Sequence, residues 1–223
     1  MIFTLRSFQV ERKDHAEFAD ISEQRIWPDL EEKGARPIGL WTVVLGGAER
    51  ILVMTRYDSL AHWQETRGWY RTSGASSARA ELVRDTSVIA LRLLTRRYPK
   101  KDDTSNNPGI YTIRTFDVRD NDVDRLVHLS EERWWHWAET GLRHMPLGQW
   151  ISIIAPEKRI YMMTRYDDMA HWEQTRDASP EPSDPELKRI WADGYAAVRE
   201  RSRMCLSTSV QILRPITGRR PIV

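Results

Sequence analysis

An internal repeat constrains this chain more than any other feature of its sequence. Residues 50–67 read RILVMTRYDSLAHWQETR and recur at 159–176 as RIYMMTRYDDMAHWEQTR, so the copies lie 109 positions apart, as Arg50 is from Arg159. The match extends upstream, because PIGLW at 37–41 aligns with PLGQW at 146–150. A repeat near the lower size limit of a domain indicates that a whole structural unit was duplicated.

The two copies differ in length after the repeated stretch. TSVIAL at 86–91 answers TSVQIL at 208–213 with a spacing of 122, so the second copy carries 13 more residues after Arg176. The candidate insertion is ASPEPSDP at 178–185, whose prolines stiffen a loop but cannot sit inside a helix or strand. We expect it to form a rim or lid over a pocket, with a plain surface loop as the alternative.

Each copy shows the same predicted order of elements. Strand-like alternation and β-forming residues occur in the first copy at 2–10, 39–45, 50–57 and 87–94. Helical spacing of apolar residues separates the first strand from the second and the third from the fourth, and the second copy repeats the pattern. The order β-α-β-β-α-β is ferredoxin-like, and two such sheets can bury their bare faces together. We therefore predict an α+β fold in which two tandem ferredoxin-like (βαββαβ) repeats form a pseudo-symmetric dimeric-type α/β barrel.

The predicted organisation has four parts, which are a first repeat at 1–95, a polar linker at 96–108, a second repeat at 109–216 and a C-terminal tail at 217–223. A formal charge of +2 argues against nucleic acid or an anionic membrane as a partner. No apolar run approaches the ~18 residues of a membrane span. The single cysteine, Cys205, fits a reducing compartment, so the cytoplasm is the expected location. A homodimer is the expected assembly.

Several short motifs of the chain resemble a known family. IYTIRTF at 110–116, GQW at 148–150 and TRYD at 164–167, each in its place between predicted helices, are similar to the NIPSNAP domain of the dimeric α/β-barrel superfamily. The first copy matches equally well, and the resemblance covers nearly the whole chain. It implies a ligand between sheet and helices or inside the barrel. Relatives include cofactor-free oxygenases, dehalogenating and isomerising enzymes, haem-dependent enzymes and proteins with no known activity, so the fold does not select a reaction.

Candidate catalytic residues come from the strands and from two helices. Both copies retain strand arginines, of which Arg114 and Arg165 could bind a carboxylate, enolate or phenolate through the guanidinium fork. The alternative for these arginines is a structural ion pair with an aspartate such as Asp167, and Tyr166 is ambiguous in the same way. His171, one turn into a helix, is a candidate base with packing or capping as the alternative.

The second copy alone has His128, which aligns with Asp20 of the first copy, together with the run RWWHW at 133–137. His128, Glu132 and Trp135 share a face at spacings of four and seven, which makes a histidine–carboxylate pair available, with surface exposure as the alternative. Ser130 lies on the buried stripe of that helix, where a bond to the preceding helical turn would satisfy its hydroxyl.

Aromatic enrichment in the second copy predicts a pocket for a small apolar or aromatic ligand. The candidate substrate-binding residues are Ser130, Arg133, Trp134, Trp135, Trp137, Trp150 and Trp172. The leading hypothesis is a cofactor-independent enzyme that acts by proton transfer, as a lyase, isomerase or oxygenase. His128 or His171 would be the base, and Arg114 or Arg165 the oxyanion partner, beside Tyr166.

The competing hypothesis is a non-catalytic ligand-binding or scaffold protein of the NIPSNAP type. The sequence has no histidine or carboxylate cluster with metal-ligand spacing, no Gly-rich phosphate loop and no nucleophile elbow. We therefore expect no metal and no cofactor. Haem held by a single histidine is the alternative.

Overall fold

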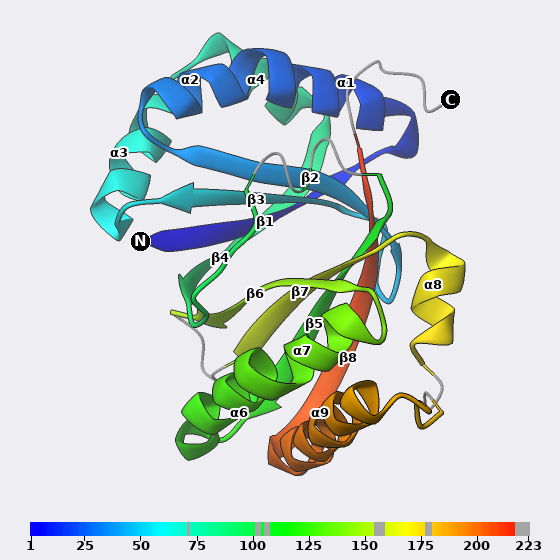
Figure 1. The fold of residues 1–223 in the computed structure, drawn as a ribbon. Helices are drawn as coiled ribbons and strands as arrows, with labels where there is room; N and C mark the ends of the chain where they lie inside the picture. Colours follow the sequence, from blue (N-terminus) through cyan, green and yellow to red (C-terminus); the bar gives the residue numbers. More distant parts are fainter. Residues whose placement is uncertain (71, 101–103, 105–107, 154–158, 177–179, 217–223) are drawn as a thin grey trace. The chain divides into compact units, whose positions relative to one another are not determined.

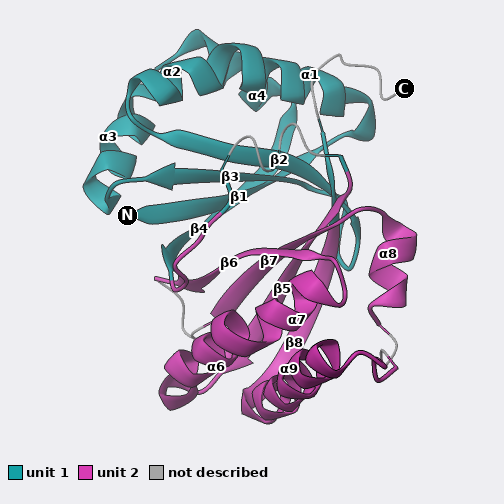
Figure 2. Ribbon diagram, viewed as in Figure 1, with its two compact units in different colours: residues 1–93, 99–108, 213–223 teal, residues 94–98, 109–212 magenta. Residues whose placement is uncertain are grey.

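The computed structural model describes residues 1–70, 72–100, 104, 108–153, 159–176 and 180–216 (Figure 1). The chain forms two compact units (Figure 2). Unit 1 comprises residues 1–93, 99–108 and 213–223, and unit 2 comprises residues 94–98 and 109–212. The first two residues of the predicted insertion, 178 and 179, and the predicted tail at 217–223 lie outside the described residues.

Unit 1 is a four-stranded antiparallel sheet in the order β4-β1-β3-β2, with helices on one face (Figure 1). Its elements are β1 (Ile2–Val10), η1 (Arg12–Asp14), α1 (His15–Ile21), η2 (Ser22–Ile26), α2 (Trp27–Glu32), β2 (Arg36–Leu45), β3 (Ile51–Tyr57), α3 (Leu60–Tyr70), α4 (Gly74–Glu81) and β4 (Val83–Leu93).

Unit 2 repeats this arrangement with the strand order β8-β5-β7-β6. Its elements are β5 (Ile110–Val118), η3 (Asp120–Asp122), α6 (Val123–Leu129), η4 (Ser130–Trp134), α7 (Trp135–Thr140), β6 (Met145–Ser152), β7 (Arg159–Tyr166), α8 (Met169–Gln174), α9 (Pro185–Met204) and β8 (Cys205–Pro215). The predicted α+β fold, with two tandem ferredoxin-like repeats of the dimeric α/β-barrel type, is confirmed.

The first long helix of each unit contains one π-helical turn, at Ser22–Ile26 and at Ser130–Trp134. In this turn the backbone N–H of Trp135 bonds the carbonyl of Ser130, five residues back. The Ser130 hydroxyl donates to the carbonyl of Leu126 at 2.6 Å, as the bond to the preceding turn requires. The π turn carries Trp134 at its C-terminal end, where the side chain reaches the cavity described below.

Each unit has a separate core, and each is completed by a short segment from beyond its own repeat. In unit 1, Ile216 packs against the core around Phe18, and its N–H donates to the carbonyl of Leu40 at 3.0 Å. In unit 2, the N–H of Leu94 donates to the carbonyl of Gln149 at 2.9 Å. Within the described ranges no helix combines the length and apolar character that a membrane span needs.

Candidate functional site

A cavity of about 590 Å³ lies in unit 2 between the sheet and the helices. Strands β5, β7 and β8 form one side of it. The other side is formed by η4, by helix α9 and by the residues that follow α8. Its lining residues are Thr112, Arg114, Phe116, Trp134, Leu142, His144, Met162, Thr164, Tyr166, Thr175, Arg176, Tyr195, Val198, Arg201, Ser202, Cys205, Leu206, Ser207 and Thr208.

The strand alternation explains which side chains of the sheet face this cavity. Alternate residues of a strand project to the same face, so Thr112 and Arg114 of β5 share a face. In the antiparallel register Thr112 lies opposite Thr164 and Arg114 opposite Met162, which places both pairs side by side. The side chains of β5 and β7 therefore form one continuous wall of the cavity.

Three guanidinium groups line the cavity, and among its described lining residues there is no aspartate or glutamate. Arg201, in α9, is 6% exposed. Its Nη2 lies 4.0 Å from the sulfur of Met162, and its guanidinium carbon lies 5.3 Å from the ring centroid of Phe116. Its Nε is buried and makes no hydrogen bond in the described part of the chain. Burial lowers the pKa of Arg201 to about 10, with a further contribution from Arg114, so it stays cationic at neutral pH.

The other two arginines add to this positive charge. Burial, followed by the charge of Arg176, lowers the pKa of Arg114, whose Nη1 donates to the hydroxyl of Thr208 at 3.5 Å. Arg176 reaches in from the end of α8, and its Nη2 donates to the hydroxyl of Tyr166 at 3.5 Å. Arg201 is buried, Arg114 is half-buried and Arg176 is exposed, and a buried cation without a carboxylate partner is costly. The cavity is therefore suited to a ligand that carries negative charge or a strong acceptor oxygen.

His144 is the one histidine among the described lining residues. It is 3% exposed and lies 4.9 Å from the ring of Tyr166 and 6.2 Å from the ring of Trp134, measured between centroids. Its Nδ1 is buried without a hydrogen-bond partner in the part of the chain that is described. Burial, then the charges of Arg176 and His171, lower the pKa of His144 to about 3. At neutral pH it is a neutral imidazole beside an arginine.

Three of the residues predicted from the sequence meet at this cavity, namely Arg114, Trp134 and Tyr166. Tyr166 is buried, and that burial raises the pKa of its hydroxyl. Trp134 lies between His144 and Tyr195, whose ring is 6.5 Å away and perpendicular to it. The aromatic wall expected from the sequence thus includes one of the predicted tryptophans.

The other predicted residues do not line the cavity. His128 is exposed on α6, and Arg165 pairs with Asp167 at 3.3 Å, as the structural alternative expected. Arg133 pairs with Asp193 at 2.6 Å. Ser130 is fully buried and accepts a bond from Gln149 Nε2. The remaining members are core or half-buried side chains: Trp135, Trp137, Trp150 and Trp172.

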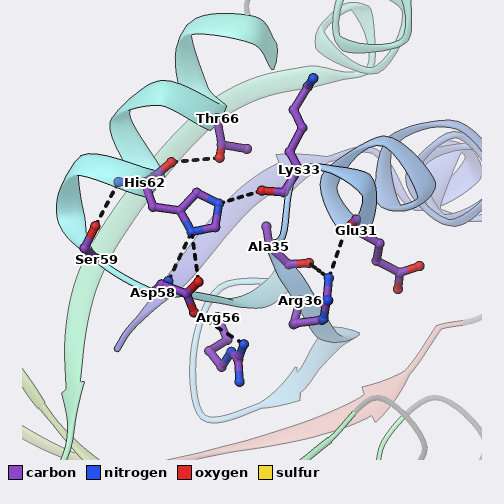
Figure 3. A network of polar contacts seen from close by, with 9 residues as sticks. All are labelled: Glu31, Lys33, Ala35, Arg36, Arg56, Asp58, Ser59, His62 and Thr66. Carbon is purple, nitrogen blue, oxygen red and sulfur yellow. Dashed lines mark hydrogen bonds and ion pairs between the residues drawn. The ribbon is translucent and has the colours of Figure 1, made fainter.

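Both ring nitrogens of His171 form hydrogen bonds, as do those of its counterpart in unit 1, His62 (Figure 3). Nδ1 of His62 accepts from the N–H of Asp58 at 3.2 Å, and Nε2 donates to the carbonyl of Lys33 at 2.8 Å. His171 makes the same two contacts, with the N–H of Asp167 at 3.3 Å and the carbonyl of Leu142 at 2.7 Å. This geometry fits the capping role weighed in the sequence analysis.

Three functional residues were missed by the sequence reasoning: His144, Arg176 and Arg201. Arg176 belongs to the repeated stretch itself, and Arg201 answers Arg79 at the spacing of 122. His144 answers Ala35 at the spacing of 109, so it belongs to the positions at which the second copy departs from the first. Comparing every aligned pair, rather than the aromatic ones alone, would have found it.

Neither the predicted insertion nor a metal-binding group is placed at the cavity by the described residues. Residues 178 and 179 lie outside the described residues, and none of 180–185 lines the cavity, so the lid stays a prediction. Over the described ranges, no group of three histidine, cysteine, aspartate or glutamate side chains is placed to hold a metal ion.

Comparisons with known proteins agree with the predicted resemblance. The NIPSNAP family model matches residues 3–92, so the resemblance seen in the motifs is confirmed. None of the curated proteins matches the chain.

Among solved structures, a candidate monooxygenase from Lactobacillus acidophilus is similar with a TM-score of 0.63 and 12% identity, over 95% of this chain and 92% of that one. A second candidate monooxygenase, from Fusobacterium nucleatum, has a TM-score of 0.59 and 10% identity, over 97% and 92%. A heme-binding protein from Thermus thermophilus has a TM-score of 0.50 and 13% identity, over 96% and 91%. At these identities the likeness shows a shared fold alone.

Proposed function

We propose that unit 2 is a cofactor-independent enzyme that binds a small aromatic anion and transfers a proton on it. The observation that carries this proposal is a cavity lined by three arginines and by a neutral, buried histidine, with no carboxylate among its described lining residues. Aromatic side chains such as Trp134 and Phe116 supply the apolar surface that a ring would contact.

The arginines support binding of an oxyanion. A guanidinium buried without a counter-ion costs several kcal/mol, which an anionic ligand would offset by pairing with it. Arg201, Arg114 and Arg176 would also stabilise negative charge that develops on an oxygen during the reaction, because they are held in place before the substrate arrives. The same groups therefore serve binding and catalysis.

His144 would be the general base. A substrate C–H next to a carbonyl, or a phenol O–H, gives its proton to a ring nitrogen of His144, and the bonding electrons move to the oxygen that faces the arginines. Return of the proton at another carbon completes an isomerisation without any further reactant. A bound anion opposes the charge of Arg176, which is one cause of the lowered pKa of His144, so substrate binding makes the imidazole a stronger base.

The proposal is tested by binding and by exchange. Aryl carboxylates and phenols are titrated against tryptophan fluorescence, and ligands that bind are followed by NMR in D2O for exchange of carbon-bound protons. We expect His144→Gln to keep binding and to lose exchange by 100-fold or more, in the range of general-base contributions of roughly 10²–10⁴. His128→Gln is the matched control and should change neither. Binding without exchange would favour the non-catalytic ligand-binding alternative, and no binding would favour the scaffold.

Two additions to this assay separate neighbouring possibilities. Uptake of dioxygen with a bound aromatic would assign an oxygenase, in which the deprotonated substrate reacts with dioxygen. A shift and sharpening of the Soret band of haemin on adding the protein, lost in His144→Gln, would assign haem binding instead. We also propose a cytoplasmic location, as expected from the single cysteine, and a homodimer, which light scattering would test.

A further inference from the structure

Unit 1 contains a second copy of the cavity wall. A small cavity of about 50 Å³ lies there, and its lining repeats the residue types of unit 2 at the repeat spacings. The residues common to both are Thr4, Arg6, Phe8, Thr55, Tyr57, Thr66, Arg67 and Arg79 in unit 1, which answer Thr112, Arg114, Phe116, Thr164, Tyr166, Thr175, Arg176 and Arg201 in unit 2. The two cavities are each lined by three arginines, yet the volume of the cavity in unit 2 is more than ten times that in unit 1.

Tyr70 lines the cavity of unit 1 and lies against Arg79, which accounts for part of this difference. Its hydroxyl accepts a hydrogen bond from Nη2 of Arg79 at 2.8 Å, and the Arg79 guanidinium carbon lies 5.3 Å from the centre of its ring. Nη1 of Arg79 donates to the hydroxyl of Ser22 at 3.0 Å. Arg79 is 6% exposed, so a buried guanidinium is satisfied here by two hydroxyls, one of them a phenol.

The corresponding arginine of unit 2 lacks both hydroxyl contacts. The equivalent serine, Ser130, instead accepts from Gln149 Nε2 at 3.0 Å. Among the described residues, Arg201 contacts the sulfur of Met162 and the ring of Phe116, and no hydroxyl bonds its guanidinium as those of Tyr70 and Ser22 bond Arg79. In unit 2 the cavity is therefore open, and Nη2 of Arg201, which matches the donor to Tyr70, has the weak acceptor sulfur of Met162 in place of a hydroxyl oxygen.

We infer that the ligand of unit 2 is a phenol whose hydroxyl or oxyanion accepts a hydrogen bond from Arg201, as the hydroxyl of Tyr70 does from Arg79. Tyr70 acts in unit 1 as a built-in copy of this ligand. The inference rests on the proposed function, because it assigns the chemical class of the molecule bound at the same site. It also assigns unit 1 a closed site of the same kind, which would open when the phenol ring of Tyr70 is removed.

The experiment uses the full chain with phenol, benzene and benzoate as probes. Calorimetry and saturation-transfer NMR measure the binding of each probe. Hydrogen bonds to charged groups contribute enough that phenol should bind the wild type about 10- to 100-fold more tightly than benzene. Arg201→Met should remove this preference, whereas Arg133→Met, which alters an arginine outside the cavity, should not. In Tyr70→Ala, phenol should bind at two sites per chain instead of one and should raise the melting temperature.

The outcomes separate this inference from the proposed function. If benzoate binds and phenol does not, the phenol assignment is wrong while the anion site stands. If neither aromatic oxygen compound binds, both are wrong. Should Tyr70→Ala fail to fold, the comparison of Arg201→Met with wild type still decides, because it leaves unit 1 unchanged: an unaltered preference for phenol over benzene overturns the inference.

Discussion

His144 is the residue of unit 2 whose chemistry depends most on its surroundings. It precedes β6 and is held between Tyr166 and Trp134, away from water. A histidine in solution changes charge near pH 6.5, but burial beside Arg176 keeps this imidazole neutral down to a pKa of about 3. His128, which the sequence proposed as a base, lies exposed on α6 and has no such environment.

This environment predicts a pH dependence of stability. Because the folded pKa of His144 is below its unfolded value of 6.5, the unfolded chain takes up the proton first as the pH falls. The stability contributed by the neutral imidazole is complete above pH 6.5 and is lost progressively toward pH 3. Between pH 7 and pH 5 we expect the free energy of unfolding of the wild type to fall by about 2 kcal/mol more than that of His144→Gln. Urea denaturation at both pH values measures this.

The control for this prediction is His128→Gln. This variant removes an exposed histidine that does not line the cavity, so its fall between pH 7 and pH 5 should equal that of the wild type. Equal falls in wild type and His144→Gln would show that His144 takes up its proton in the folded state as readily as in the unfolded one.

At the scale of elements, α9 shows how one glycine sets the packing of a helix. The helix begins after Asp184, whose side chain accepts from the N–H of Leu187 at 2.8 Å, and Pro185 occupies its first turn. Gly194 lies in its interior, where a Cβ would come within 2.7 Å of the Cβ of Trp137. The absence of a side chain therefore lets α9 approach α7 closely.

Two glycine-to-alanine changes should have opposite signs. Gly194→Ala is expected to lower the free energy of unfolding by about 1–3 kcal/mol, because the added methyl group forces the helices apart. Gly68→Ala, in α3, has no atom within 4 Å of the new Cβ and should raise it by about 0.5–1 kcal/mol through helix propensity. Urea denaturation compares both with wild type. A stabilising Gly194→Ala would contradict the packing argument.

For the molecule as a whole, the important feature is that the units are not simply consecutive in sequence. Residues 94–98 follow the last strand of unit 1 but belong to unit 2. There the hydroxyl of Thr95 accepts from the N–H of Gln149 at 3.0 Å, and the guanidinium of Arg97 lies 4.4 Å from the ring centroid of Trp135. Part of the predicted linker at 96–108 is therefore structural, because it completes the second unit.

This sharing predicts that the boundary of a fragment decides its stability. A fragment of residues 94–212 contains all of unit 2, including Leu94 and Thr95, which bond the backbone of Gln149. A fragment of residues 99–212 lacks both and leaves the backbone N–H and C=O of Gln149 without these partners. We expect a clearly lower urea midpoint for 99–212, since an unsatisfied buried polar group costs about 1–3 kcal/mol. Thr95→Ala in the full chain tests the same contact and should destabilise it. Identical midpoints for the two fragments would contradict the role of residues 94–98.

Sequence alone determined the repeat, the β-α-β-β-α-β order and the α+β class, because these depend on spacing and on periodicity along the chain. It also identified Arg114 and Tyr166 on two strands and Trp134 on a helix, and all three line the same cavity. These properties are local, and a linear pattern records them.

Only the tertiary structure decided which of the two similar walls encloses an open cavity. Arg79 and Arg201 are the same residue at matched positions, yet one is satisfied by Tyr70 and the other is not. His144 and Arg201 reach one cavity from a loop and a helix that are far apart in sequence. Burial, free volume and hydrogen-bond partners depend on contacts between distant residues, and spacing along the chain does not encode those contacts in a form that a single sequence reveals.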